Sequence, residues 1–135
     1  MNPYKTKSHS KFLLRYHLVF VTKYRRKILS ASFDEYVKGE LTRISRLPDS
    51  RFSIEVMETD KDHVHMMISS EPTVSPASFA RRLKQMSTMS AWKEFPDYLR
   101  KTYWHDRVLW SSGYFVCTTG DASAETIRHY IENQG

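Results

Sequence analysis

Two histidines separated by one residue give this sequence its clearest chemical signal. His63 and His65 follow the polar segment 59–62 and begin a run in which polar and apolar side chains alternate, as expected for a half-buried strand. Both imidazoles therefore project from one face of a sheet. Residues two apart on a strand have Cα atoms roughly 6.5 Å apart, so both rings can reach one divalent cation. A third ligand must come from elsewhere in the chain.

A second candidate group lies near the end of the chain, on a predicted amphipathic helix. Ile127, Tyr130, Ile131 and Gln134 recur at helical spacing and share one face. If this helix docks over the histidine face, Gln134 can offer a carbonyl oxygen to the cation and Tyr130 stands beside it. A tyrosine hydroxyl has a reference pKa of about 10, so it attacks at neutral pH only if a base, a cation or local positive charge favours its ionised form.

Each of these residues has a simpler explanation. Paired histidines on a strand are often hydrogen-bonded or exposed, a tyrosine on an amphipathic helix is usually a core residue, and a glutamine near a chain end is usually solvated. Asp60 and Asp62 most simply form the turn through Asx-type hydrogen bonds, although either could orient an imidazole or a water beside a metal. The combination is more informative than its members, because one cation needs this ligand set and one nucleophile on two specific faces.

The elements that must position these groups follow from periodicity and end signals. The prediction is a single domain over residues 1–135 with an α+β fold, ferredoxin-like or RRM-like: an antiparallel sheet with helices on one face and an added C-terminal helix carrying Tyr130. The expected order is a strand at 16–22, a helix from about 32 to 46, a strand at 52–56 that forms a hairpin with the histidine strand, a helix from about 75 to 95, a long functional loop at 96–112, a strand at 113–119 and a helix from about 123 to 134.

The same patterns predict which side chains face the helix layer. Alternation in the strand at 52–56 places its apolar row on the core side, and helical spacing does the same for one stripe of the helix at 75–95. The inward-facing residues predicted in this way are Phe52, Ile54 and Val56 on the strand, and Phe79, Leu83, Met86 and Met89 on the helix.

Charge suggests an anionic partner. The net charge is +6 and the pI is near 9.5. The cluster Lys23, Tyr24, Arg25, Arg26 and Lys27 follows the first strand and mixes cations with an aromatic ring, which suits phosphates and stacked bases, although a solvated basic turn would have the same composition. The further residues predicted to bind DNA are Arg81, Arg82 and Lys84. In the alternative of a non-catalytic nucleic-acid binder, the residues that would stack on bases are Tyr24, Tyr103, Trp104 and Trp110.

The composition also indicates the cellular compartment. A single cysteine, Cys117, excludes an internal disulfide and a multi-cysteine zinc site, which favours a reducing cytoplasm. The sequence has no run of eighteen apolar residues and no apolar segment of signal-peptide type at its start. The expectation is a soluble cytoplasmic protein without a membrane partner.

Four blocks, taken in order, resemble the single-tyrosine HUH transposases of small bacterial and archaeal insertion sequences, a family with a branch that acts on repeated palindromic elements. The resemblance covers nearly the whole chain. The blocks are Tyr16-His-Leu-Val-Phe-Val-Thr-Lys-Tyr-Arg-Arg-Lys27, Thr59-Asp-Lys-Asp-His-Val-His65, Gly113-Tyr-Phe-Val-Cys-Thr-Thr-Gly120 and Tyr130-Ile-Glu-Asn-Gln134.

The resemblance implies roles for these residues. His63 and His65 would be metal ligands, Gln134 would complete an Mg²⁺ or Mn²⁺ site, and Tyr130 would be the nucleophile. It further implies a homodimer in which the tyrosine helix of one subunit can complete the histidine site of the other. Such an enzyme would cut and rejoin single-stranded DNA near subterminal hairpins, through a 5′-phosphotyrosine intermediate and a free 3′-hydroxyl.

Two other functions fit the same residues. One is a non-catalytic single-stranded nucleic-acid binder, or an inactive transposase, on the same fold. The other is a metal-dependent hydrolase in which water attacks instead of Tyr130.

Overall fold

The computed structural model describes residues 13–118 and 123–134, and its elements follow the predicted order. The predicted end of the fourth strand, at Thr119, lies outside the described residues. The elements are β1 (Leu14–Val21), the 3₁₀ helix η1 (Lys23–Arg25), α1 (Ala31–Ser45), β2 (Phe52–Asp60), β3 (His63–Ser70), α2 (Pro76–Glu94), α3 (Pro96–Arg100), β4 (Phe115–Thr118) and α4 (Ala124–Glu132).

The four strands form one antiparallel sheet in the order β2-β3-β1-β4. This is the ferredoxin-like arrangement, so the predicted fold class is confirmed. The last four residues of β1 are fully buried, because β1 lies inside the sheet and both of its faces are covered at that end.

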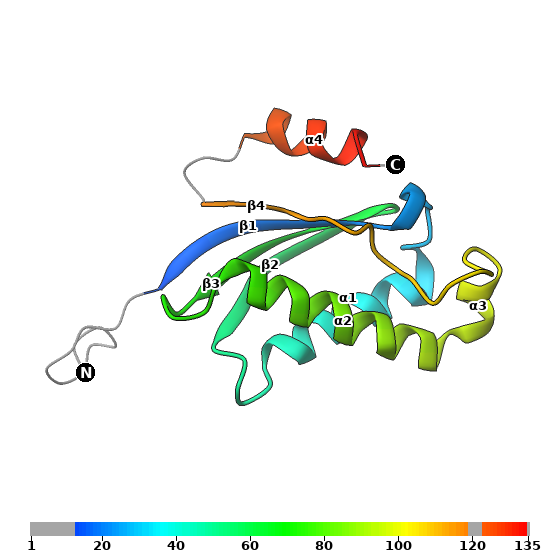
Figure 1. The fold of residues 1–135 in the computed structure, drawn as a ribbon, viewed down its shortest axis with the longest axis horizontal. Coiled ribbons are helices and arrows are strands. Elements are labelled where there is room, and N and C mark those ends of the chain that lie inside the picture. The colour runs from blue at the N-terminus through cyan, green and yellow to red at the C-terminus, as the bar shows by residue number, and fades with distance from the viewer. Residues whose placement is uncertain (1–12, 119–122, 135) are drawn as a thin grey trace, which may run out of the picture.

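Helices cover the two faces of the sheet unequally (Figure 1). α1 and α2 lie side by side on one face, where a continuous core includes Leu18 and Phe20 of β1, Met66 of β3, Leu41 of α1 and Leu83 of α2. α4 lies alone on the opposite face (Figure 1). Its start is defined by Ser123, whose hydroxyl accepts a hydrogen bond from the Thr126 amide at 3.0 Å.

Two predicted core positions are wrong. A β-bulge between Ile54 and Val56 shifts the alternation, so Met57 pairs with Met66 and packs against the core while Val56 is 51% exposed. Met89 is 73% exposed, because the core stripe of α2 continues instead through smaller residues such as Ser87 and Ala91.

The segment 96–112, predicted as a long functional loop, contains a short helix and contributes side chains to the core. α3 begins it, and Tyr103 and Trp110 are buried at 4% and 5% exposure. The Tyr103 hydroxyl donates to the Lys23 carbonyl at 2.8 Å, and the Trp110 indole donates to the Ser87 hydroxyl at 2.9 Å. Their predicted role in stacking on bases is therefore wrong; Tyr24 and Trp104 remain exposed.

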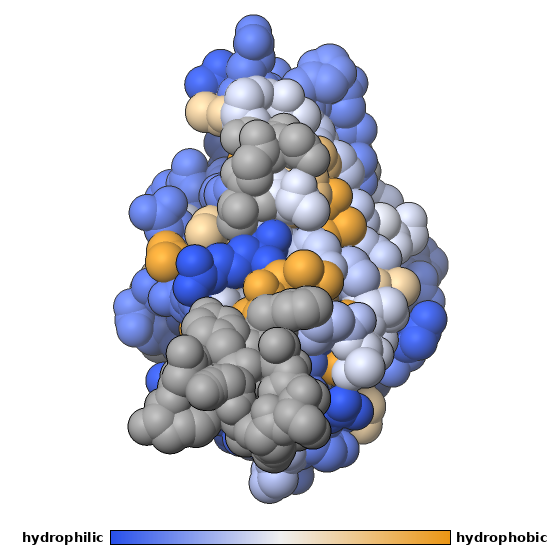
Figure 2. Space-filling model, turned by 90° about the vertical axis from the view of Figure 1, so that its left-hand side faces the viewer, coloured by the Kyte–Doolittle hydropathy of each residue, from blue (hydrophilic) through white to orange (hydrophobic). Residues whose placement is uncertain are grey.

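The end of the molecule at which β1 begins has a mainly hydrophilic surface with small apolar areas (Figure 2). Leu13 and Leu14, at this end, are about two-fifths exposed (45% and 41%). Scattered exposed leucines of this kind are normal for a globular protein. No helix within the described part of the chain is long and apolar enough to cross a membrane.

Candidate active site around the histidine pair

The histidine pair occupies the sheet face covered by α4. His63 pairs with Val21 across the β1·β3 ladder, and His65 pairs with Val19. Val19 and Val21 form a small apolar cluster with Ile131 of α4. Alternation along β3 sends Val64 and Met66 to the opposite, helix-packed side, where both are fully buried. The prediction that both imidazoles share one face is confirmed.

A pocket of about 630 Å³ lies between the histidines and α4. It is bounded by the η1 region, the β2–β3 turn and one side of α4, so segments far apart in the sequence meet there. The lining residues are Arg25, Lys27, Asp60, Lys61, Asp62, His63, His65, Ala124, Ile127, Arg128, Ile131 and Glu132.

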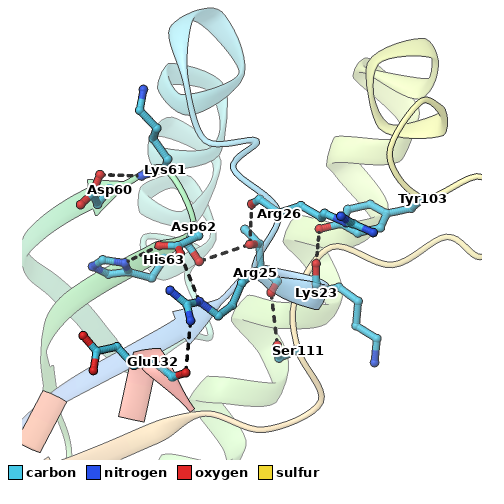
Figure 3. A network of polar contacts seen from close by, with 11 residues as sticks. Lys23, Arg25, Arg26, Asp60, Lys61, Asp62, His63, Tyr103, Ser111 and Glu132 are labelled. Atoms are coloured by element: carbon cyan, nitrogen blue, oxygen red, sulfur yellow. Dashed lines mark hydrogen bonds and ion pairs between the residues drawn. The ribbon is translucent and has the colours of Figure 1, made fainter. Parts of the chain in front are cut away.

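Asp62 connects His63 to the basic cluster and to α4 (Figure 3). One carboxylate oxygen lies 3.0 Å from His63 Nδ1, and the other lies 3.4 Å from Arg25 Nε. The Arg25 guanidinium also donates to the Glu132 carbonyl, at 3.1 Å, in the last turn of α4. A carboxylate can only accept, so Nδ1 of His63 carries a proton, and in the neutral ring Nε2 keeps its lone pair.

The short turn between β2 and β3 is fixed by local and tertiary bonds. β2 continues to Asp60, so the turn is only residues 61 and 62, shorter than the predicted 59–62. Asp60 accepts from the Lys61 amide at 2.8 Å, which is a contact with the next residue and not with the second residue on, as the predicted Asx-type bond requires. The amides of Leu29 and Thr22 donate to the carbonyls of residues 61 and 62, each at 2.9 Å. These bonds hold Asp62 and His63 in place.

His65 has a different partner, which the sequence gave no reason to single out. Nδ1 of His17, on β1, lies 2.8 Å from Nε2 of His65, with ring centroids 5.0 Å apart. Burial lowers the pKa of His65, and the nearby His17 adds to that effect. Alternation within β1 could have placed His17 on the same face as Val19 and Val21, but only the strand register brings it to His65.

His63 and His65 could hold a divalent cation, but they supply only part of its ligands. Across residues 13–118 and 123–134, no three His, Cys, Asp or Glu side chains are arranged to hold a metal ion. The chain therefore offers two imidazoles, with other ligand positions left to an amide, water or phosphate oxygens. Imidazole combined with oxygen ligands suits Mn²⁺ better than Mg²⁺.

Tyr130 lies on the same face of the sheet but on the other side of α4 from the pocket. Its ring packs against Phe115 of β4, with centroids 5.5 Å apart. Phe115 pairs with Val19, which pairs with His65, so this row places Phe115 and His65 two strands apart, roughly 10 Å between Cα atoms. The described residues that line the pocket do not include Tyr130 or Gln134.

The Tyr130 hydroxyl is buried and has no hydrogen-bond partner among the described residues. A Cβ atom built on Gly113 would lie 3.7 Å from it. Burial raises the pKa of Tyr130 to about 12, so the phenol in this position is a poor nucleophile. Gln134 follows the last turn of α4, where its amide donates to the Ile131 carbonyl at 3.2 Å and its side chain is half-buried.

The basic cluster is built on a strained turn. Tyr24 and Arg25 have φ values of 59° and 53°, in the left-handed region that non-glycine residues rarely adopt. The Tyr24 ring is 56% exposed, and the Lys23 ammonium and Arg26 guanidinium lie 5.3 and 5.9 Å from its centroid. An exposed ring flanked by two cations can stack on a base while the cations contact phosphates.

The three predicted DNA contacts on α2 lie on the side of the sheet away from the histidines, and two of them have partners within the protein. The Lys84 ammonium donates to the carbonyls of residues 111, 112 and 113 at 2.7, 3.0 and 3.1 Å. Burial lowers the pKa of Lys84, with a smaller contribution from Lys23. Arg82 pairs with Asp49 at 2.7 Å, whereas Arg81 is exposed. The contacts within the protein therefore explain the positions of Lys84 and Arg82 without a contact to DNA.

The chain combines a ferredoxin-like sheet with a histidine pair and a tyrosine helix on one face. Comparison with known proteins identifies the family that has this combination. The model of the family described as "Transposase IS200 like" matches residues 10–134. The chain belongs to the IS200-like transposase family. It is 31% identical over 134 residues to the transposase for insertion sequence element IS200 of Salmonella typhimurium, covering 99% of this chain and 85% of that protein. It is 28% identical over 123 residues to the ISDra2 transposase TnpA of Deinococcus radiodurans, covering 91% and 85%.

Solved structures agree with the fold. A crystal structure of a Deinococcus radiodurans R1 protein described as a transposase superposes with a TM-score of 0.84 at 28% identity, covering 99% of this chain and 98% of that one. The REP-associated tyrosine transposase bound to a REP hairpin gives a TM-score of 0.57 at 14% identity, covering 99% and 70%. The second likeness concerns the fold alone.

Proposed function

We propose that this protein is a transposase that cuts and rejoins single-stranded DNA at element ends, with Tyr130 as the nucleophile. The observation that carries the proposal is the placement of the histidine pair and the Tyr130 helix on one sheet face, around a pocket bordered by Arg25, Lys27 and Arg128. A phosphodiester entering this pocket would meet cations and imidazoles together. The similarity to the IS200 and ISDra2 transposases supports the same function.

The proposed reaction is a transesterification. The Tyr130 oxygen attacks the scissile phosphorus and loses its proton, the bond from phosphorus to the 3′ oxygen breaks, and that oxygen leaves as a 3′-hydroxyl after gaining a proton. The 5′-phosphotyrosine keeps the energy of the broken bond, so a later 3′-hydroxyl can attack it without a nucleotide triphosphate. Bound Mg²⁺ or Mn²⁺, held by His63, His65 and in the assembled site Gln134, would withdraw charge from the phosphate and stabilise the leaving oxygen.

Tyr130 must leave its position against Phe115 before it can reach a scissile phosphate. Burial against β4 raises its pKa to about 12, and β1 lies between it and the histidine strand. We therefore propose a homodimer in which α4 moves on DNA binding or inserts into the partner subunit's histidine site. The turn around Tyr24, with its flanking cations, is the proposed contact for the single strand, and a subterminal hairpin is the proposed recognition element.

The test is incubation with end-labelled single-stranded DNA carrying a terminal hairpin, with Mn²⁺, followed by a denaturing gel. The expected result is a covalent adduct with the wild type and with the control Tyr114→Phe, and none with Tyr130→Phe. His63→Ala should bind the DNA but cleave it at least a hundredfold more slowly, because the site loses a metal ligand. Binding without any cleavage by the wild type would instead favour the non-catalytic binder. Cleavage that persists in Tyr130→Phe would favour a hydrolase.

A further inference from the structure

His17 has no role in the chemistry described so far, yet it makes the only direct side-chain hydrogen bond that the described part of the chain provides to the ring of His65. It lies on β1, opposite Met67 of β3, whereas His65 lies opposite Val19. The two histidines are therefore diagonal neighbours on one sheet face, a spacing across which rings make contact. Nδ1 of His17 lies 2.8 Å from Nε2 of His65.

This contact constrains the protons of both rings. Two bare nitrogen lone pairs at 2.8 Å would repel, so one nitrogen must carry a proton and the other must accept it. Each ring is half-buried, so water competes weakly for this bond. A neutral imidazole has one protonated and one unprotonated nitrogen, so the bond also decides which nitrogen of His65 remains free.

The hydrogen bond of His63 suggests which nitrogen of His65 carries the proton. Its Nδ1 donates to Asp62, so in the neutral ring Nε2 is the unprotonated nitrogen. Metal-ligating histidines nearly always bind through one nitrogen and donate the N–H of the other to a neighbouring acceptor. For His65 the only nitrogen engaged in a described hydrogen bond is Nε2, and its partner is Nδ1 of His17. If His65 follows the same rule, Nε2 is the donor and Nδ1 of His17 is the acceptor.

We propose that His17 is the positioning residue of His65: its Nδ1 accepts the Nε2–H of His65, fixes the tautomer and rotation of that ring, and leaves Nδ1 of His65 to face a divalent cation. The inference rests on the proposed metal role of His63 and His65. It makes the two ligands unlike, one held by a carboxylate at Nδ1 and the other by an imidazole at Nε2. His17 itself is not a ligand in this arrangement.

Loss of the acceptor has a defined physical consequence. Without His17 Nδ1, the His65 ring can rotate by half a turn and exchange its two tautomers, so the correct nitrogen faces the cation only part of the time. Replacement of such a partner typically lowers metal affinity about 10- to 100-fold. Asparagine should preserve most of the affinity, because its side-chain oxygen can occupy the place of Nδ1, whereas phenylalanine keeps the ring shape without any acceptor.

The experiment uses the full-length protein without DNA. Mn²⁺ affinity is measured by the electron paramagnetic resonance signal of the free ion for the wild type, His17→Phe, His17→Asn and the matched control His105→Phe, an exposed histidine outside the site. The expected result is about 10- to 100-fold weaker binding in His17→Phe, most of the affinity retained in His17→Asn, and no change in His105→Phe. Long-range ¹H–¹⁵N spectra of the metal-free wild type should show His65 protonated at Nε2, which tests the proposal even if His17→Phe does not fold.

Three results would overturn the inference: wild-type Mn²⁺ affinity in a folded His17→Phe, an Nδ1–H tautomer of His65 in the wild type, or three coordinated imidazole nitrogens in the electron spin echo modulation of bound Mn²⁺. His63→Ala and His65→Ala separate this failure from a failure of the proposed function. If they abolish Mn²⁺ binding while His17→Phe does not weaken it, only the positioning role is wrong. If they bind Mn²⁺ as the wild type does, the metal site itself is wrong.

Discussion

The two faces of the sheet are stabilised in different ways. On the α1 and α2 side, a large cluster of fully buried apolar residues extends across the sheet and both helices. On the α4 side, the buried apolar cluster among the described residues consists of Val19, Val21 and Ile131, and polar or titratable groups occupy most of the remaining positions near the pocket. The first face supplies the stability of the fold, and the second leaves charged and hydrogen-bonding groups accessible beneath a helix held by few apolar contacts.

The largest expected effect comes from the helix-packed face. Phe79 is fully buried between Tyr16 and Phe52, with ring centroids 5.6 and 5.4 Å away. Phe79→Ala should lower the free energy of unfolding by about 3–5 kcal/mol, because it removes apolar contacts and leaves a cavity. Urea denaturation measures this loss. A loss below about 1 kcal/mol would mean that this face is not the main source of stability.

A smaller global effect is expected from the α4 face. Ile131 is 9% exposed and belongs to the small cluster with Val19 and Val21. Ile131→Ala should lower global stability by no more than about 1 kcal/mol, while α4 opens more often because it can undock without unfolding the core. Hydrogen exchange should accelerate in α4 and stay unchanged in β1 and β3. A global loss equal to that of Phe79→Ala would remove the distinction between the two faces.

The buried phenol of Tyr130 gives a third measurement. Its folded-state pKa of about 12 lies above the unfolded value of 10.0, so between these values the folded state binds more protons and stability falls as pH rises. At pH 11 the wild type should have lost about 1 kcal/mol that Tyr130→Phe does not lose. Urea denaturation at pH 8 and pH 11 provides the comparison. Equal losses in the two proteins would mean that the phenol is not held against Phe115 in solution.

The smallest expected effect concerns the contact between Arg25 and the end of α4. Arg25→Ala removes the bonds to Asp62 and to the Glu132 carbonyl, and should destabilise α4 docking by less than about 1 kcal/mol, seen as faster hydrogen exchange in α4. Lys27→Ala is the matched control, since Lys27 lines the same pocket and the substitution removes the same charge. DNA affinity should fall by a similar factor in both variants. Equal exchange in both would show that Arg25 does not hold α4.

Periodicity predicted the strands and helices well, because burial on one face imposes a regular pattern wherever an element packs on a single layer. It failed where the packing was irregular. The bulge after Ile54 reversed the exposure of Val56, and Tyr103 and Trp110 entered the core because distant polar groups satisfy their hydrogen bonds. Neither event has a local signal in the sequence.

The sequence by itself determined the order of the elements, the common face of His63 and His65, and the amphipathic character of the helix that carries Tyr130, because these follow from residue type and spacing along one element. Only the tertiary structure decided that His17 meets His65, that Asp62 joins His63 to Arg25, and that Tyr130 packs against Phe115 on the far side of α4 from the pocket. Those contacts depend on strand register and helix docking, which bring together residues separated by tens of positions and are set by packing of the whole fold rather than by any local pattern.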